Sequence, residues 1–223
     1  MRVLATKLLS PEFKDRLIHH GFSVVEFPFI SISPQPISAF EVENHVIFTS
    51  QNAVQIAFKN KRLNANLQGK KFFCVGEKTK SLLSKNGQKV IKMSQNSLKL
   101  ARFLAKNYKN ESFSFFCGDL RRPEIESVFL DHQMQIQLHE IYKTTLTPKQ
   151  FTQAFEGILF YSPSAVESFF QKNTWQENTQ GFCLGTTTAR KLNEFTENYS
   201  IAKTPSESHL LLTLTQHFRQ SHA

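Results

Sequence analysis

The fold is decided by two stretches of nearly the same pattern, residues 46–54 (VIFTSQNAV) and residues 158–166 (ILFYSPSAV). Each begins with an apolar run typical of a buried strand, continues through a turn of small polar residues and enters a helix-like stretch. Their last valines are 166 − 54 = 112 positions apart, about half of the 223-residue chain. A repeat of this length indicates a duplicated α/β unit.

A second pair of stretches supports the duplication. Residues 72–83 (FFCVGEKTKSLL) resemble residues 181–192 (GFCLGTTTARKL), and the glycines that follow their apolar runs are 185 − 76 = 109 positions apart. The two pairs together divide the chain into copies at residues 1–111 and 112–223.

Each copy alternates strand-like and helix-like segments. In the first copy we expect strands at residues 2–5, 23–27, 45–49, 72–75 and 90–93, and helices at residues 10–21, 52–59, 79–85 and 97–107. Short apolar strands separated by helices of about ten residues are typical of parallel sheets that are covered on both faces. The sequence therefore predicts a doubly wound α/β architecture.

Two extended stretches interrupt this alternation at equivalent places in the copies. They are residues 28–36 (PFISISPQP) and residues 140–148 (EIYKTTLTP), both rich in β-branched residues or bounded by proline. Such residues disfavour a helix. We interpret the two stretches as crossings between two domains, which pair side by side as a short ribbon.

Composition limits the class of protein. The net charge is 27 − 18 = +9, which favours an anionic ligand, although a general solubility bias explains it equally well. Lysines and arginines are scattered, which argues against a dedicated nucleic-acid arm. The three cysteines form no C-x-x-C pair and are expected to be buried thiols rather than metal ligands. Without a long apolar stretch, we expect a soluble cytoplasmic protein with no membrane span.

Four turns of small residues each follow a predicted strand and open a predicted helix. Ligands of α/β sheets bind at the carboxyl ends of strands, where free backbone N–H groups and hydroxyls attract anions. The alternative is that the hydroxyl residues are simply helix caps. The candidate ligand-binding residues of these turns are Thr49, Ser50, Asn52, Ala53, Gly76, Thr79, Ser162, Ser164, Ala165, Gly185, Thr186, Thr187 and Thr188.

A further turn, in residues 115–125 (FFCGDLRRPEI), contains Gly118, Arg121 and Arg122. Two arginines at a strand end are suited to hold a carboxylate in a fork. A solvated helix start is the alternative, but cations are disfavoured at that end of the helix dipole. The sequence has no P-loop, no G-x-G-x-x-G and no H-E-x-x-H pattern, so it signals neither a nucleotide phosphate cradle nor a zinc site.

The ordered set FTSQNAV, VGEKT, CGDLRRPE, IYKT, SPSAV and LGTTTA closely resembles the uroporphyrinogen-III synthase family over nearly the whole chain. The resemblance implies two flavodoxin-like α/β domains joined by a two-stranded linker, with the active site in the cleft of the pair. It also implies an exchange, in which residues 1–33 join residues 145–223 and residues 36–140 form an inserted domain. The linkers would lie at about residues 28–36 and 140–148. The repeat alone would give two contiguous halves instead.

The same resemblance implies the chemistry. The family closes the linear tetrapyrrole hydroxymethylbilane with loss of water and inversion of its last ring, without a cofactor or a metal. It implies that Tyr142 is the proton donor; packing at the junction of linker and domain is the alternative role. Tyr161 departs from the threonine that is usual before Ser162 in the family. We expect a monomer, and we keep as alternatives a non-enzymatic two-lobed anion-binding module and a nucleic-acid binder.

Overall fold

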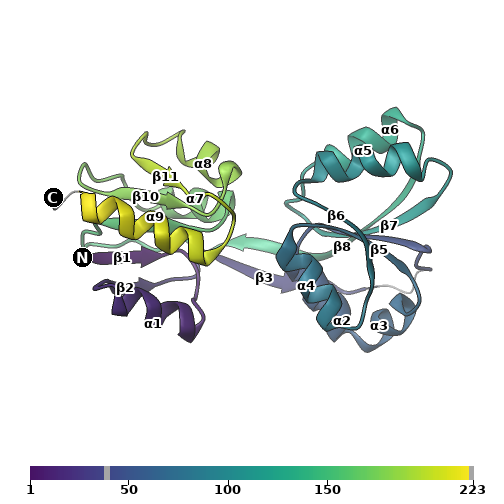
Figure 1. Ribbon diagram of the computed structural model, residues 1–223, viewed down its shortest axis with the longest axis horizontal. Helices are drawn as coiled ribbons and strands as arrows, with labels where there is room; N and C mark the ends of the chain where they lie inside the picture. Colours follow the sequence, from purple (N-terminus) through teal and green to yellow (C-terminus); the bar gives the residue numbers. More distant parts are fainter. Residues whose placement is uncertain (38–40, 221–223) are drawn as a thin grey trace. The chain divides into compact units, whose positions relative to one another are not determined.

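The chain divides into two compact units in a computed structural model that describes residues 1–37 and 41–220 (Figure 1). Unit 1 contains Met1–Ser31 and Thr145–Ala223, and unit 2 contains Ile32–Thr144. The predicted domain ranges 36–140 and 145–223 include residues 38–40 and 221–223, which lie outside the described residues. Among the helices that are described, none has the length and apolar character that a bilayer span requires.

Unit 1 is a five-stranded sheet with helices on both faces. Its strands lie in the order β11-β10-β9-β1-β2, and each neighbouring pair is parallel. They are β1 (Arg2–Ala5), β2 (Ser23–Glu26), β9 (Gly157–Phe160), β10 (Gln180–Cys183) and β11 (Tyr199–Ile201). One face packs against α1 (Pro11–His19) and α9 (Glu207–Gln220), and the other packs against α7 (Pro163–Phe170) and α8 (Thr186–Leu192). Helices on both faces explain why the central strand β9 is apolar and buried throughout.

The sheet of unit 1 combines strands from both sequence copies. Val3 of β1 lies opposite Gly157 of β9, so a strand from the first copy pairs with a strand from the second. Contiguous halves would instead have kept β1 with the later strands of its own copy. The repeat by itself therefore misplaces β1 and β2.

Unit 2 is a six-stranded sheet in the order β3-β8-β7-β4-β5-β6. Its strands are β3 (Ile30–Pro34), β4 (His45–Phe48), β5 (Lys71–Val75), β6 (Val90–Ser94), β7 (Ser112–Gly118) and β8 (Gln135–Leu146). Helices α2 (Gln51–Lys59), α3 (Lys61–Leu67) and α4 (Glu77–Lys85) cover one face, and α5 (Ser97–Asn107) and α6 (Glu124–Asp131) cover the other (Figure 1). Helix α3 was not predicted; it begins where the Asn60 side chain accepts a hydrogen bond from the Leu63 N–H at 3.0 Å.

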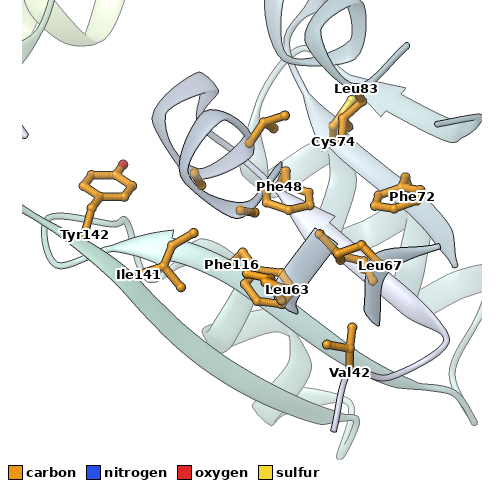
Figure 2. Packing of buried hydrophobic residues seen from close by; sticks show 14 residues of the cluster. Val42, Phe48, Leu63, Leu67, Phe72, Cys74, Leu83, Phe116, Ile141 and Tyr142 are labelled. Atoms are coloured by element: carbon orange, nitrogen blue, oxygen red, sulfur yellow. The ribbon is translucent and has the colours of Figure 1, made fainter. Parts of the chain in front are cut away.

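Phenylalanine rings fill the core of unit 2. Phe48 stacks on Phe116 with ring centroids 5.3 Å apart and on Phe72 at 6.3 Å. Figure 2 shows these rings in the middle of the cluster, with Tyr142 at its edge. Stacked rings bury large apolar areas and explain why 22 of the 223 residues are phenylalanine.

The two extended stretches lie side by side. The Thr147 N–H donates to the Phe29 carbonyl at 2.9 Å, and the Gln35 N–H donates to the Ile141 carbonyl at 2.9 Å. The partners run in opposite directions along the chain, so β3 is antiparallel to this part of β8. Strand β8 is longer than the extended stretch expected from residue 140, because it begins at Gln135 and pairs with β7 from there.

Acid is expected to destabilise unit 2 through His139. Its ring stacks on Phe116 at 4.8 Å, its Nε2 lies 3.3 Å from the Ser114 Oγ, and burial lowers its pKa to about 4. An ordinary histidine pKa is about 6.5. The unfolded chain therefore binds the proton first, and stability that is complete above about pH 6.5 is lost as the pH falls toward 4.

Replacing His139 with glutamine should reduce the loss of unfolding free energy between about pH 6.5 and pH 4 by about 1–3 kcal/mol. The measurement is the free energy of unfolding at a series of pH values. His132, an exposed residue at the end of α6, provides a matched control in His132→Gln. If the free energy of unfolding falls equally with pH in wild type and in His139→Gln, His139 is not the cause of the acid sensitivity.

Candidate functional site

In unit 2, two predicted turns lie at the carboxyl edge of the sheet. Ser50 follows β4, and its Oγ accepts a hydrogen bond from the Ala53 N–H at 3.0 Å, which caps α2. Gly76 follows β5 and begins α4 with a φ of 85°, a value that favours glycine. Because β4 and β5 are neighbouring parallel strands, both turns lie on the same side of the sheet.

The predicted residues of these turns differ in accessibility. Thr49, Ser50, Asn52 and Gly76 are half-buried, while the side chains of Ala53 and Thr79 are buried. Thr79 lies in the first turn of α4 and is not its cap. A ligand at this edge of the sheet could therefore reach the backbone of Thr79 but not its hydroxyl.

Tyr142 connects the turn after β4 to strand β8, which lies on the other side of β7 in the sheet. Its hydroxyl lies 3.0 Å from the Ser50 Oγ, so a serine that caps a helix also contacts the phenol. The side chain is 9% exposed, and burial raises its pKa above the ordinary value. A phenol with a raised pKa stays protonated at neutral pH, as a proton donor must.

Gly118 leaves room for the Tyr142 ring because it has no side chain. A Cβ at this position would lie 2.3 Å from the ring carbons Cε2 and Cζ and 2.8 Å from the hydroxyl. The next residue, Asp119, ties the turn after β7 to β8: its Oδ1 accepts the Thr144 N–H at 2.9 Å, and its N–H donates to the Tyr142 carbonyl at 3.2 Å. The glycine of this turn is therefore explained by packing against Tyr142.

The two arginines of the same turn differ. Arg121 is engaged by two carboxylates, with Glu126 at 2.8 Å and Glu140 also in contact, and its side chain is 20% exposed. Arg122 has a single looser partner, Glu124, at 3.6 Å, and is 48% exposed. The frustration expected from cations at this helix start is relieved by these glutamates. Of the pair, Arg122 is the one more accessible to an anion.

Unit 1 repeats the arrangement after β9 and β10. The Ser162 Oγ accepts the Ala165 N–H at 3.1 Å, which caps α7, and lies 3.1 Å from the Ser164 Oγ. Gly185 begins α8 without a side-chain cap. The other predicted residues of the second turn are Thr186, which is exposed, Thr187, which is half-buried, and Thr188, which is buried.

Lys7, at the end of β1, belongs to the same edge of unit 1 and was missed by the sequence analysis. Its Nζ lies 4.5 Å above the Tyr161 ring and 2.7 Å from a Glu207 carboxylate oxygen. The Tyr161 hydroxyl is buried without a partner among the residues described, and burial raises its pKa. The signal for Lys7 was its position two residues after the end of a predicted strand, which the search for paired turns did not use.

Both units thus carry, at the carboxyl edge of a parallel sheet, turns with helix-start amides and hydroxyls, and unit 2 adds a protonated phenol. This arrangement is typical of α/β proteins that bind anionic ligands. The family model HEM4, described as uroporphyrinogen-III synthase HemD, matches residues 11–211. The chain belongs to this family, and it is accordingly a cyclising hydro-lyase of tetrapyrrole (haem) biosynthesis.

Solved structures with a similar fold carry the same family name. Uroporphyrinogen-III synthetase from Helicobacter pylori is 21% identical, with a TM-score of 0.70 over 97% of this chain and 100% of that one. A mutant uroporphyrinogen III synthase from Thermus thermophilus is 14% identical, with a TM-score of 0.71 over 99% of both chains. These similarities establish a mixed α/β fold with parallel sheets. No curated protein sequence matches the chain.

Proposed function

We propose that this chain closes hydroxymethylbilane into uroporphyrinogen III and that Tyr142 donates the proton that helps the hydroxyl to leave. The observation that carries the proposal is the 3.0 Å contact between the Tyr142 hydroxyl and the Ser50 Oγ, at the edge of the sheet where the turns of unit 2 gather. The phenol there carries a proton at neutral pH and is positioned by a hydrogen-bond partner, which supports a role as general acid.

The proposed reaction loses one water. Protonation of the terminal hydroxymethyl group by the Tyr142 phenol lets the C–O bond break, which leaves an electrophilic azafulvene. The substituted carbon of the last pyrrole attacks it and forms a spiro intermediate. That intermediate fragments and recloses with the last ring reversed, and the proton lost on aromatisation returns to the phenolate or to water. The protein mainly has to hold reacting atoms in position, which contributes roughly 7–11 kcal/mol in well-oriented systems.

We propose that the carboxylates of the substrate are held by the strand-end turns of both units. The candidate groups are Ser50, Asn52, Gly76 and Arg122 in unit 2, and Ser162, Ser164, Gly185, Thr186 and Thr187 in unit 1. Other predicted residues would act through their backbone or their packing: Thr49, Ala53, Gly118, Ala165, Thr79 and Thr188. Arg121 would act through its ion pairs. The net charge of +9 supports binding of a polyanion.

Arg122→Gln should raise KM about 2- to 5-fold with little change in kcat, because an exposed cation contributes about 1 kcal/mol or less to binding an anion. Arg121→Gln should mainly lower the free energy of unfolding, since it leaves Glu126 and Glu140 without their cation. Steady-state kinetics and denaturant unfolding of the two variants separate these outcomes. A larger KM effect at Arg121 than at Arg122 would reverse the assignment.

The decisive test of the proposed function is the isomer formed. Hydroxymethylbilane closes spontaneously to the type I product, so chromatography of the oxidised products with and without protein should show an excess of type III only with protein. Type I product at the uncatalysed rate, together with measurable binding of the linear tetrapyrrole, would instead favour the non-enzymatic module.

We infer further that both units are flavodoxin-like domains joined by β3 and β8 as a two-stranded linker. The order β2-β1-β9-β10-β11 of unit 1 is the 2-1-3-4-5 order of that fold, and β8-β7-β4-β5-β6 of unit 2 is the same order after circular permutation. Expression of residues 32–144 alone should give a folded protein by circular dichroism, and an unfolded product would contradict the division into two domains.

We also propose a cytoplasmic monomer that binds no nucleic acid. All three cysteines are free and buried, as is usual where thiols stay reduced. Light scattering coupled to gel filtration and an oligonucleotide titration at low salt would test the oligomeric state and the nucleic-acid partner.

A further inference from the structure

A cavity of about 370 Å³ opens at the surface of unit 1, away from the strand-end turns. Its lining includes Ile158 near the start of β9 and Thr179, the residue before β10. In a parallel sheet the amino ends of the strands lie at the opposite edge from the carboxyl ends. The cavity is therefore separate from the turns assigned to the substrate, and its volume falls in the range of small-molecule sites.

Aromatic rings form the apolar part of the lining. Five of them line the cavity: Phe151, Phe155, Phe169, Phe170 and Trp175. Trp175 lies nearly parallel to Phe170, with centroids 6.0 Å apart and planes at 28°, while Phe151 meets Phe155 edge-on at 5.4 Å. Walls of flat rings in these orientations accept a further planar ring by stacking or edge contact.

Hydrogen bonds hold this wall open. The Asn173 Oδ1 accepts the Phe151 N–H at 2.9 Å, and its Nδ2 donates to the Lys149 carbonyl at 2.7 Å and to the Phe169 carbonyl at 2.8 Å. The Thr179 hydroxyl donates to the Phe155 carbonyl at 2.8 Å. These bonds join the segment that enters unit 1 to the end of α7, so the cavity is preformed rather than induced by a ligand.

The polar groups of the lining select charge. Lys172 is the one charged side chain among the described residues that line the cavity, and the rest of the rim is made of glutamine, asparagine and threonine. The Lys172 ammonium is therefore the group of the lining that favours an anion.

We propose that this cavity binds a planar aromatic monoanion, a one- or two-ring system with a single carboxylate. The rings of the ligand lie against the aromatic rings of the lining, and its carboxylate faces Lys172. The site goes beyond the proposed function and does not depend on it, because it lies at the other edge of the sheet from the turns of unit 1.

Trp175 makes the proposal directly measurable, since it is the only tryptophan of the sequence. Titration of the full chain with 2-naphthoate should change the tryptophan emission in a saturable way, and calorimetry should give the same Kd. The neutral amide of the same shape, 2-naphthamide, should bind about 2- to 5-fold more weakly, which is the effect of one exposed ion pair. No saturable change with either compound would overturn the proposal.

Variants locate the ligand. Lys172→Gln should weaken naphthoate binding to that of naphthamide, whereas Lys149→Gln, the same charge change on a neighbour that lies over Phe27 and Phe151 outside the lining, should leave it unchanged. Trp175→Phe, followed by calorimetry, should weaken binding about 2- to 10-fold, because the smaller ring offers the ligand less apolar contact area. Equal effects of both lysine changes would show a general charge effect, and no effect of Lys172→Gln and Trp175→Phe would place the ligand elsewhere.

Discussion

Tyr142→Phe is expected to lower the turnover number by about 10²- to 10⁴-fold, the contribution usual for a general acid, with a much smaller change in KM. The substitution keeps the ring that packs on Gly118 and removes only the hydroxyl that contacts Ser50. The fold should survive it, because losing one hydrogen bond costs about 1 kcal/mol. Turnover measured with hydroxymethylbilane, alongside circular dichroism, checks both statements.

Tyr199→Phe is the matched control. The Tyr199 hydroxyl donates to Asn193 at 3.1 Å at the surface of unit 1, outside the proposed machinery, so its loss should leave turnover unchanged. The pH profile adds a second readout. Burial raises the Tyr142 pKa above its ordinary value of about 10. Tyr142 therefore keeps its proton below about pH 10, and deprotonation of this residue should not lower the wild-type rate in that range. An unchanged turnover number in Tyr142→Phe would remove the residue from the mechanism.

Gly118→Ala should lower both stability and turnover. The added methyl group would lie 2.3 Å from two carbons of the Tyr142 ring, so the ring must move away from Ser50. Such overpacking costs about 1–3 kcal/mol of unfolding free energy. The displaced phenol should also lose most of the turnover that Tyr142→Phe loses. Denaturant unfolding followed by circular dichroism and the isomer assay measure the two effects.

Gly185→Ala tests whether any alanine at a strand-end glycine has this effect on stability. No atom lies within 4 Å of a Cβ at Gly185, and its φ of −163° suits any residue, so the loss should stay below about 1 kcal/mol. A second comparison uses Tyr142→Ala as background. Without the ring, Gly118→Ala should cost little, because the two sites are in contact and their effects are not additive. A full cost in that background would show that the turn itself, rather than the ring, rejects a side chain.

Local patterns accounted for much of the fold and of the candidate site. The small polar turns after the apolar runs predicted that Ser50 and Ser162 begin helices, and both side chains accept the N–H three residues further on. A cap depends on a few consecutive residues, so it can be predicted from the sequence. One local element was missed: helix α3 has only seven residues, Lys61–Leu67, too few to show a repeated apolar pattern.

Contacts between residues that are far apart in the sequence could not be predicted from local patterns. Tyr142 and Ser50 are 92 positions apart, and the ion pair of Arg121 with Glu140 depends on which strand lies beside β7. Periodicity says which face of a strand is apolar, but not which strand will pair with it. Residue types therefore identified Arg121 as a candidate anion ligand, and the fold shows its charge already satisfied.

The sequence by itself determined the alternation of strands and helices, the duplication, the capped turns and the family. Only the tertiary structure decided that Val3 pairs with Gly157, that the Tyr142 phenol reaches Ser50 over Gly118, and that a ring-lined cavity opens beside Trp175. The physical reason is that capping and burial patterns are set by neighbours in the chain. Sheet pairing and cavities instead depend on the free energy of packing whole elements together, to which every copy of a repeat offers nearly the same surface.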